Sequence, residues 1–206
     1  MDDFEIKNKS EMLSKLRAYA TSPDDDNIRI KEKIKQTLLN CPELLYALHN
    51  KELEGELFDK NGNLTPDGEW DRYFGVGSNI KPTIIIPETQ TEVANYLCYK
   101  VETESIPTFN TIEKYCRTTF IIYCHKDDSY DKETGIARTD LIGSIIREVF
   151  NWSHYFGPEC KIVFDADTIT DKTYVTRTIV FENKMANSIT KTTKGRTEVI
   201  NYRVKI

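Results

Sequence analysis

The residues that could do chemistry fall in a few places, and the first is the segment 59–70, DKNGNLTPDGEW. Oxygen-bearing side chains occupy every second position from Asp59, which is how an EF-hand calcium loop begins. Such a loop needs glycine at its sixth position and glutamate at its twelfth. Those positions hold Leu64 and Trp70. We therefore interpret the segment as a hairpin turn at Asn61-Gly62 and expect no metal here.

A pair of aspartates is the second place. Asp165 and Asp167 lie two residues apart in FDADTITD, so in a strand both carboxylates point to one face and could share a divalent metal. Metal-dependent nucleases also need an acid and a lysine on the neighbouring strand, where this chain offers Arg177. A metal-dependent hydrolase using the two aspartates therefore stays open as an alternative. The favoured interpretation is a strand end that faces solvent.

The remaining candidates are histidines and a glycine pair. His49, His125 and His154 have no second ligand at a metal-binding spacing. The glycines of GVGSN, at 75–79, precede a proline and not a helix, so they do not form a phosphate-binding loop. No nucleophile motif is present either. The sequence thus predicts no catalytic residue, no metal ligand and no cofactor, and we expect a protein that is not an enzyme.

The composition predicts a folded protein with a solvated surface. Of the 206 residues, 39% are hydrophobic and 30% are charged, and the net charge is −5. An acidic chain without a basic stripe is not typical of a general nucleic-acid binder. The five cysteines are odd in number and form no CxxC motif, so we expect reduced thiols in a cytosolic product. No apolar run is long enough to span a membrane.

The positioning elements begin with helices. Apolar residues recur at helical spacing over 9–20, and again over 24–40, where Ile30, Ile34 and Leu38 form the predicted buried stripe. A short third helix is expected over 42–50. The helical pattern stops after residue 50, and a turn-rich connection follows.

A period of two then indicates strands, interrupted by one helix. The helix is expected over 139–153, with Thr139 as its N-cap and an apolar stripe that includes Ile142, Ile146 and Phe150. On the segment 112–125, both faces are partly apolar, which predicts a central strand. The expected strands are 81–88, 93–104, 112–125, 160–167, 173–182 and 198–206.

Helices followed by strands predict an α+β fold: N-terminal helices, then a mostly antiparallel twisted sheet with one long helix packed across it. We divide the chain into an N-terminal helical region, a turn-rich insertion with a hairpin, an α+β domain and a C-terminal arm. Their bounds are 1–50, 51–80, 81–182 and 183–206.

The order of these elements resembles a known family. The segment IKQTLLNCPELLYALHN, at 34–50, is similar to a stretch near the start of neck and tail-completion proteins of tailed bacteriophages. The part from Lys81 to Glu182 resembles their tail-terminator domain. In that resemblance, IEKYCRTTFIIYCHKDD is the long central strand and RTDLIGSIIREVFNWS is the helix that crosses the sheet, with Arg138 as the basic residue just before it.

The resemblance implies a non-enzymatic virion protein, assembled in the host cytoplasm. It would form a homo-oligomeric ring, usually a hexamer, that ends the tail tube and joins it to the neck. Its partners would be further copies of itself, the tail tube protein and head-completion, adaptor or portal-associated neck proteins. DNA would pass through the lumen without specific binding, and no membrane would be involved. A head-side neck or adaptor ring of the same fold is an alternative.

Contacts with neighbouring subunits are expected from three segments: the 51–80 insertion, the edge strand KPTIIIPE and the basic C-terminal arm. The predicted interaction residues are Asn61, Gly62, Trp70, Tyr73, Phe74, Ile84, Ile85, Ile86, Lys191, Lys194 and Arg196.

Overall fold

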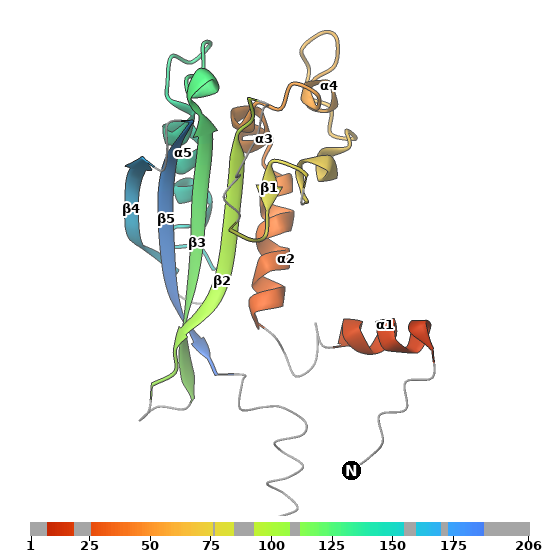
Figure 1. Cartoon of the computed structure of the whole chain (residues 1–206), viewed down its shortest axis with the longest axis vertical. Helices are drawn as coiled ribbons and strands as arrows, with labels where there is room; N and C mark the ends of the chain where they lie inside the picture. The colour runs from red at the N-terminus through yellow and green to blue at the C-terminus, as the bar shows by residue number, and fades with distance from the viewer. Residues whose placement is uncertain are drawn as a thin grey trace, which may run out of the picture.

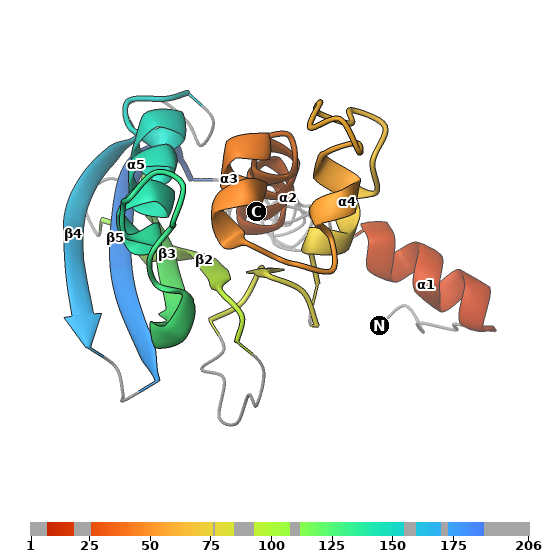
Figure 2. The ribbon, with the colours of Figure 1, turned by 90° about the horizontal axis from the view of Figure 1, so that it is seen from above.

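A computed structural model describes residues 8–18, 26–75, 77–84, 93–107, 112–154, 160–169 and 173–187. One curved sheet is covered by helices on one face, as Figures 1 and 2 show. The α+β fold class is therefore confirmed. The elements in chain order are α1 Lys9–Ala18, α2 Asp26–Leu39, α3 Pro42–Leu48, α4 Glu54–Leu57, η1 Trp70–Tyr73, β1 Ile80–Lys81, β2 Tyr96–Ser105, β3 Glu113–His125, η2 Lys126–Asp128, α5 Arg138–Phe150, β4 Lys161–Ile169 and β5 Tyr174–Ala186.

The sheet has five strands in the order β1-β2-β3-β5-β4. The central strand is β3, as predicted, and it pairs antiparallel with β2 and β5. At the edge, β1 pairs parallel with β2 and is only two residues long, so the strand expected over 81–88 begins earlier and is shorter among the residues described. Residues 85–92 and the last strand expected over 198–206 lie outside the described residues.

The two faces of β3 are buried differently. On one face, Phe120, Ile122 and Cys124 belong to the main core under the helices. The Phe120 ring stacks on that of Phe150 in α5, with 5.1 Å between ring centroids. On the other face, Tyr123 belongs to a smaller buried cluster with Tyr96, Cys98 and Tyr174. The prediction that both faces are partly apolar is therefore confirmed.

Helix α5 begins one residue earlier than expected. Ala137 is its N-cap, while Thr139 lies buried inside the first turn. The Ala137 carbonyl accepts from the backbone amides of Asp140 and Leu141, and the amide of Arg138 donates to the Ser129 carbonyl. These backbone bonds fix the start of the helix, so the prediction of Thr139 as N-cap is wrong. The buried stripe of Ile142, Ile146 and Phe150 is confirmed.

The predicted stripe of α2 is also confirmed. Ile30, Ile34 and Leu38 are buried in the same core as the sheet and α5. In contrast, α1 contains no buried residue. Within the described residues, no helix combines the length and apolar character needed to cross a bilayer. The five cysteines are thiols and not disulfides.

The connection over 51–80 is packed onto the body. Tyr73 is fully buried, and Trp70 and Phe74 pack partly buried against the main core. The Trp70 indole donates to the Glu56 carbonyl at 2.9 Å. A Cβ on Gly68 would lie 1.9 Å from that same oxygen, so only glycine permits this close approach. These contacts place the aromatic residues inside the molecule and not on a protruding loop.

Candidate functional site

A buried polar network lies where β3 ends and α5 begins. His49 ends α3 in the left-handed conformation, with φ 51°. Asn95 precedes β2, and Asp128 lies on η2 after β3. Arg138 is the first residue of α5, and Asp131 lies in the loop before it. The end of α3, the residue before β2, the segment after β3 and the start of α5 therefore bring their polar side chains to one end of the sheet.

Asp128 is the hub of this network. Its Oδ2 lies 2.7 Å from Nδ1 of His49 and accepts from Nδ2 of Asn95 at 2.8 Å. Its Oδ1 lies 3.6 Å from Nε of Arg138. Asn95 also donates to the Leu48 carbonyl, and its Oδ1 accepts from the backbone amide of His125. The hub therefore ties α3, the start of β2 and the end of β3 to α5.

Arg138 and Asp131 form a buried ion pair beside the hub. The two side chains are 4% and 2% exposed, with 3.1 Å between Nη2 of Arg138 and Oδ1 of Asp131. Arg138 also donates to the Ala47 carbonyl at 3.2 Å. Hydrogen bonds from Thr134 to Asp131, together with the Arg138 charge, hold the pKa of the Asp131 carboxyl below its usual range. The pair is thus charged and hydrogen-bonded, as a buried pair must be.

A cavity of about 440 Å³ lies against this network, lined by residues that include Tyr46, His49, Lys51, Tyr130 and Arg138. The contact with Asp128 orients the His49 ring. No Ser, Thr or Cys nucleophile is among the described residues that line the cavity. Because the network joins α3, β2, β3 and α5 through buried hydrogen bonds, we interpret it as a clamp that fixes the helices on the sheet.

Sequence reasoning found only Arg138 of this network, through the resemblance. One local signal could have indicated more. A cation in the first turn of a helix opposes the helix dipole, so Arg138 needs nearby carboxylates. Its partners Asp128 and Asp131 are ten and seven residues upstream, across a loop whose path no pattern in the sequence predicts.

The two aspartates considered as metal ligands lie in a different charged cluster. Asp165 accepts from Nε and Nη2 of Arg177 at 2.7 and 3.0 Å, and from Arg147 of α5 at 3.2 Å. Arg177 also bonds Asp140. The hydrogen bond from Arg177 is the main reason why the pKa of Asp165 lies below its usual range. The Asp165 carboxylate therefore anchors β4 to β5 and α5.

Within the described ranges, no three His, Cys, Asp or Glu side chains gather as a metal site would require. At the 59–70 segment, the Asp59 carboxylate accepts from the backbone amides of Asn61 and Asn63, both at 2.8 Å. The hairpin expected there exists, but its turn has three residues with Gly62 at φ 81°. Asp59 thus holds a turn together.

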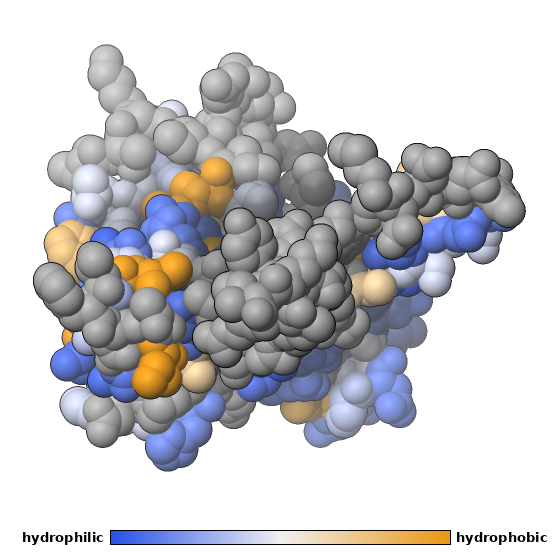
Figure 3. All heavy atoms as spheres, turned by 90° about the horizontal axis from the view of Figure 1, so that it is seen from below, coloured by the Kyte–Doolittle hydropathy of each residue, from blue (hydrophilic) through white to orange (hydrophobic). Residues whose placement is uncertain are grey.

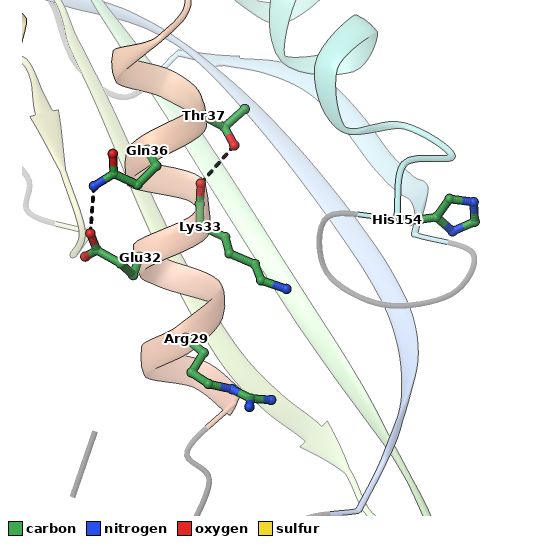
Figure 4. A pocket seen from close by; sticks show the side chains of 6 residues that line it. All are labelled: Arg29, Glu32, Lys33, Gln36, Thr37 and His154. Atoms are coloured by element: carbon green, nitrogen blue, oxygen red, sulfur yellow. Dashed lines mark hydrogen bonds between the residues drawn. The ribbon is translucent and has the colours of Figure 1, made fainter. Parts of the chain in front are cut away.

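A groove runs beside the solvent side of α2. It has a volume of about 770 Å³, and its described lining consists of Arg29, Glu32, Lys33, Gln36, Thr37 and His154. Figure 4 shows Arg29 and Lys33 on the side of α2 that faces His154. Gln36 donates to Glu32 and Thr37 to the Lys33 carbonyl, both at 2.8 Å, so part of the wall is bonded within the helix.

The predicted interaction residues do not form one surface. Asn61 and Gly62 are exposed at the hairpin, Tyr73 is buried, and Trp70 and Phe74 are partly buried. Ile84 packs partly buried against the cluster of Tyr96 and Tyr123. The others lie outside the described residues: Ile85, Ile86, Lys191, Lys194 and Arg196.

Exposed apolar side chains lie elsewhere. Ile106 follows β2, and Ile112 and Tyr115 lie at the start of β3, at the lower end of the sheet in Figure 1; Ile112 is 76% exposed. Figure 3 views this end and shows apolar groups interspersed with hydrophilic ones. On the edge strand β4, Val163 and Phe164 are 43% and 48% exposed.

Comparison with known proteins adds one finding. No curated protein and no solved structure matches the chain. A family model named YomW matches residues 42–204, which is most of the chain. The matched range begins at α3 and includes the whole sheet and α5. The chain therefore belongs to the YomW family, a phage-derived family.

Proposed function

We propose that this protein is a structural virion protein of a tailed phage. It forms a ring at the head–tail interface, ends the tail tube and joins it to the neck. Membership of a phage-derived family supports a phage role. The α+β fold with one helix across the sheet agrees with the element order that resembles tail terminators.

The observation that carries the proposal is the open edge of β4. Among the described strands, β4 pairs only with β5, so its other edge presents main-chain donors and acceptors. The register shifts between Ile162 and Phe164, and both Val163 and Phe164 are about half exposed there. An exposed apolar edge is a surface to which another chain can add a strand.

Such a contact suits a ring. A strand added by a neighbour makes a head-to-tail contact, and head-to-tail contacts close into a ring when the rotation between subunits allows it. The net charge of −5 suits a lumen through which DNA passes, because an acidic wall repels phosphates.

The test is electron microscopy of the purified protein mixed with tail-tube subunits. The wild-type chain should form rings that cap tubes of defined length. Phe164→Lys should sharply reduce the number of rings, because a buried lysine at the subunit contact costs desolvation energy. Val93→Lys is the matched control, since Val93 is similarly exposed and lies outside β4.

A phage that lacks the gene gives the second arm of the test. Its particles should have tails of abnormal length that do not join heads. Normal, head-joined tails in this phage, together with no ring in the mixture, would refute the proposal. Localising the protein in particles also separates a tail terminator from a head-side adaptor ring of the same fold.

A further inference from the structure

Helix α1 has an apolar stripe that its own chain leaves exposed. Met12, Leu13 and Leu16 lie on one side of the helix, and all three are exposed; Leu16 is 56% exposed. Lys9, Lys15 and Arg17 outnumber the single acid Glu11, so the helix is basic although the chain is acidic. An amphipathic helix of this kind is stable when its apolar side packs into a groove.

A groove of matching character lies at the other end of the body. It has a volume of about 560 Å³ between α3, α5 and the hairpin at 58–64. Phe58, Leu64, Leu141 and Ile145 supply its apolar lining. Two acids, Glu43 and Glu133, lie among the lining residues. Leu64 is exposed, so apolar surface at this groove faces solvent.

We propose that α1 of one copy docks its apolar stripe into this groove of a second copy. The apolar stripe fits the apolar lining, and the basic residues of α1 meet Glu43 and Glu133. Complementary charge of this kind fixes the orientation of a docked helix and speeds its association. The proposal deepens the proposed function, because it assigns a contact between ring neighbours, and it rests on that function.

The position of the groove favours a second copy over the same chain. Figure 1 shows α1 near the lower end of α2 and α3 near its upper end. The 14 residues of α2 separate these ends by about 21 Å. The residues between Ala18 and Asp26 span at most roughly 25 Å when fully extended. Helix α1 could thus reach the groove of its own chain only with a nearly straight linker. Docking into the groove of a neighbouring copy removes this constraint.

The contact is heterologous, since a stripe on one copy meets a different surface on the next. Each copy therefore offers one stripe and one groove, which is the arrangement that closes rings. This contact uses none of the residues of β4. Two independent contacts between the same neighbours would hold a ring more firmly than either alone.

The test uses the full chain with Phe164→Lys, which removes the β4 contact, and measures its mass by sedimentation velocity. Leu16→Asp should weaken self-association about tenfold or more, because it places a charge in the apolar contact. Ser14→Asp adds the same charge on the opposite side of α1 and should leave association unchanged. Circular dichroism verifies that each variant is folded.

A mixing experiment separates exchange between copies from docking within one chain. Both chains in this experiment also carry Phe164→Lys. The Leu16→Asp chain keeps its groove, and a Leu64→Lys, Glu43→Lys chain keeps its stripe. Each should be monomeric alone, and the mixture should form a one-to-one dimer through the remaining stripe and groove. A mixture that stays monomeric, or a Leu16→Asp chain that associates like its parent, would overturn the proposal.

A third measurement tests a membrane surface as the partner of α1. Vesicles of an anionic phospholipid should not bind the chain. Binding that is lost in Leu16→Asp, without self-association of the parent, would also overturn the proposal. If dimers form in the mixture but no ring caps the tail tube, the α1 contact stands and the virion role fails. If rings survive Leu16→Asp unchanged, the virion role stands and the α1 contact fails.

Discussion

Helices α1 and α2 have the same kind of sequence and opposite surroundings. Both carry an apolar stripe at helical spacing beside charged residues. In α2 the stripe is fully covered, with Ile34 0% exposed, because β2, α3 and η1 lie against it. In α1 the stripe is exposed. The comparison teaches that an apolar stripe specifies a helix that needs a partner, but not whether the partner is in the same chain.

The largest expected effect tests this comparison directly. Ile34→Ala should lower the free energy of unfolding by about 2–5 kcal/mol, because it leaves a cavity in the core. Leu16→Ala removes a similar side chain from α1 and should change the free energy of unfolding by less than about 0.5 kcal/mol in the monomer. Urea unfolding followed by circular dichroism measures both. Equal losses in the two variants would show that α1 packs on its own body.

The next largest effect is expected at the buried ion pair of Arg138 and Asp131, which belongs to the body that covers α2. Asp131→Asn should cost about 2–3 kcal/mol, since the Arg138 charge stays buried with Asp128, at 3.6 Å, as its remaining carboxylate. Asp67→Asn, at an exposed position, is the matched control. The same urea titration measures both. A loss no larger than that of the control would mean that the network does not clamp the helices.

A smaller effect is expected at Gly68, which shows how tightly the 51–80 connection joins the body. In Gly68→Ala the new Cβ meets the Glu56 carbonyl, so the backbone must shift, at a cost of about 1–3 kcal/mol. Gly55→Ala should be neutral or slightly stabilising, because nothing lies within 4 Å of the added Cβ. Thermal unfolding of the two variants distinguishes these outcomes. A neutral Gly68→Ala would indicate that the connection is held loosely against the body.

The smallest effect is the pH dependence of stability in the body. The pKa values of Asp131 and Asp165 are lowered by their hydrogen bonds, to Thr134 and Arg177 respectively, and by the neighbouring arginines. Their contribution is therefore complete above the ordinary value of 3.8 and is lost as the pH falls through the lowered folded-state values. Asp165→Asn should flatten the decline in urea midpoint between about pH 5 and pH 2. Asp67→Asn should leave this decline unchanged. A decline in Asp165→Asn as steep as in the wild-type chain would contradict the assignment.

Local pattern was sufficient for most of the fold. Helical spacing located α2 and α5, and alternation located β2, β3, β4 and β5, because each element buries one side at its own period. The N-cap of α5 was predicted wrongly. The amide of Arg138 donates to Ser129 and the amide of Asp140 donates to Ala137, and the bond to Ser129 depends on the path of the loop. The turn at Asn61-Gly62 was located correctly, but its length was not.

The candidate site was far less predictable. No shared motif links the residues of the network, because the sheet brings them together from segments up to 89 positions apart in the sequence. They are His49, Asn95, Asp128 and Arg138. Likewise, Asp165 and Asp167 could be paired on one face from the sequence, but the arginines that bind Asp165 come from α5 and β5. Only packing shows that Asp165 is an anchor.

By itself, the sequence determined which segments form helices and strands and which of their sides are apolar, since side-chain period and apolar spacing are local properties. The tertiary structure decided which of those sides are covered within the chain. It also decided which charges meet, because a contact between distant segments depends on the geometry of the sheet and not on spacing along the chain. The aromatic residues of the 51–80 connection lie in the core or pack against it for that reason, while the stripe of α1 is exposed.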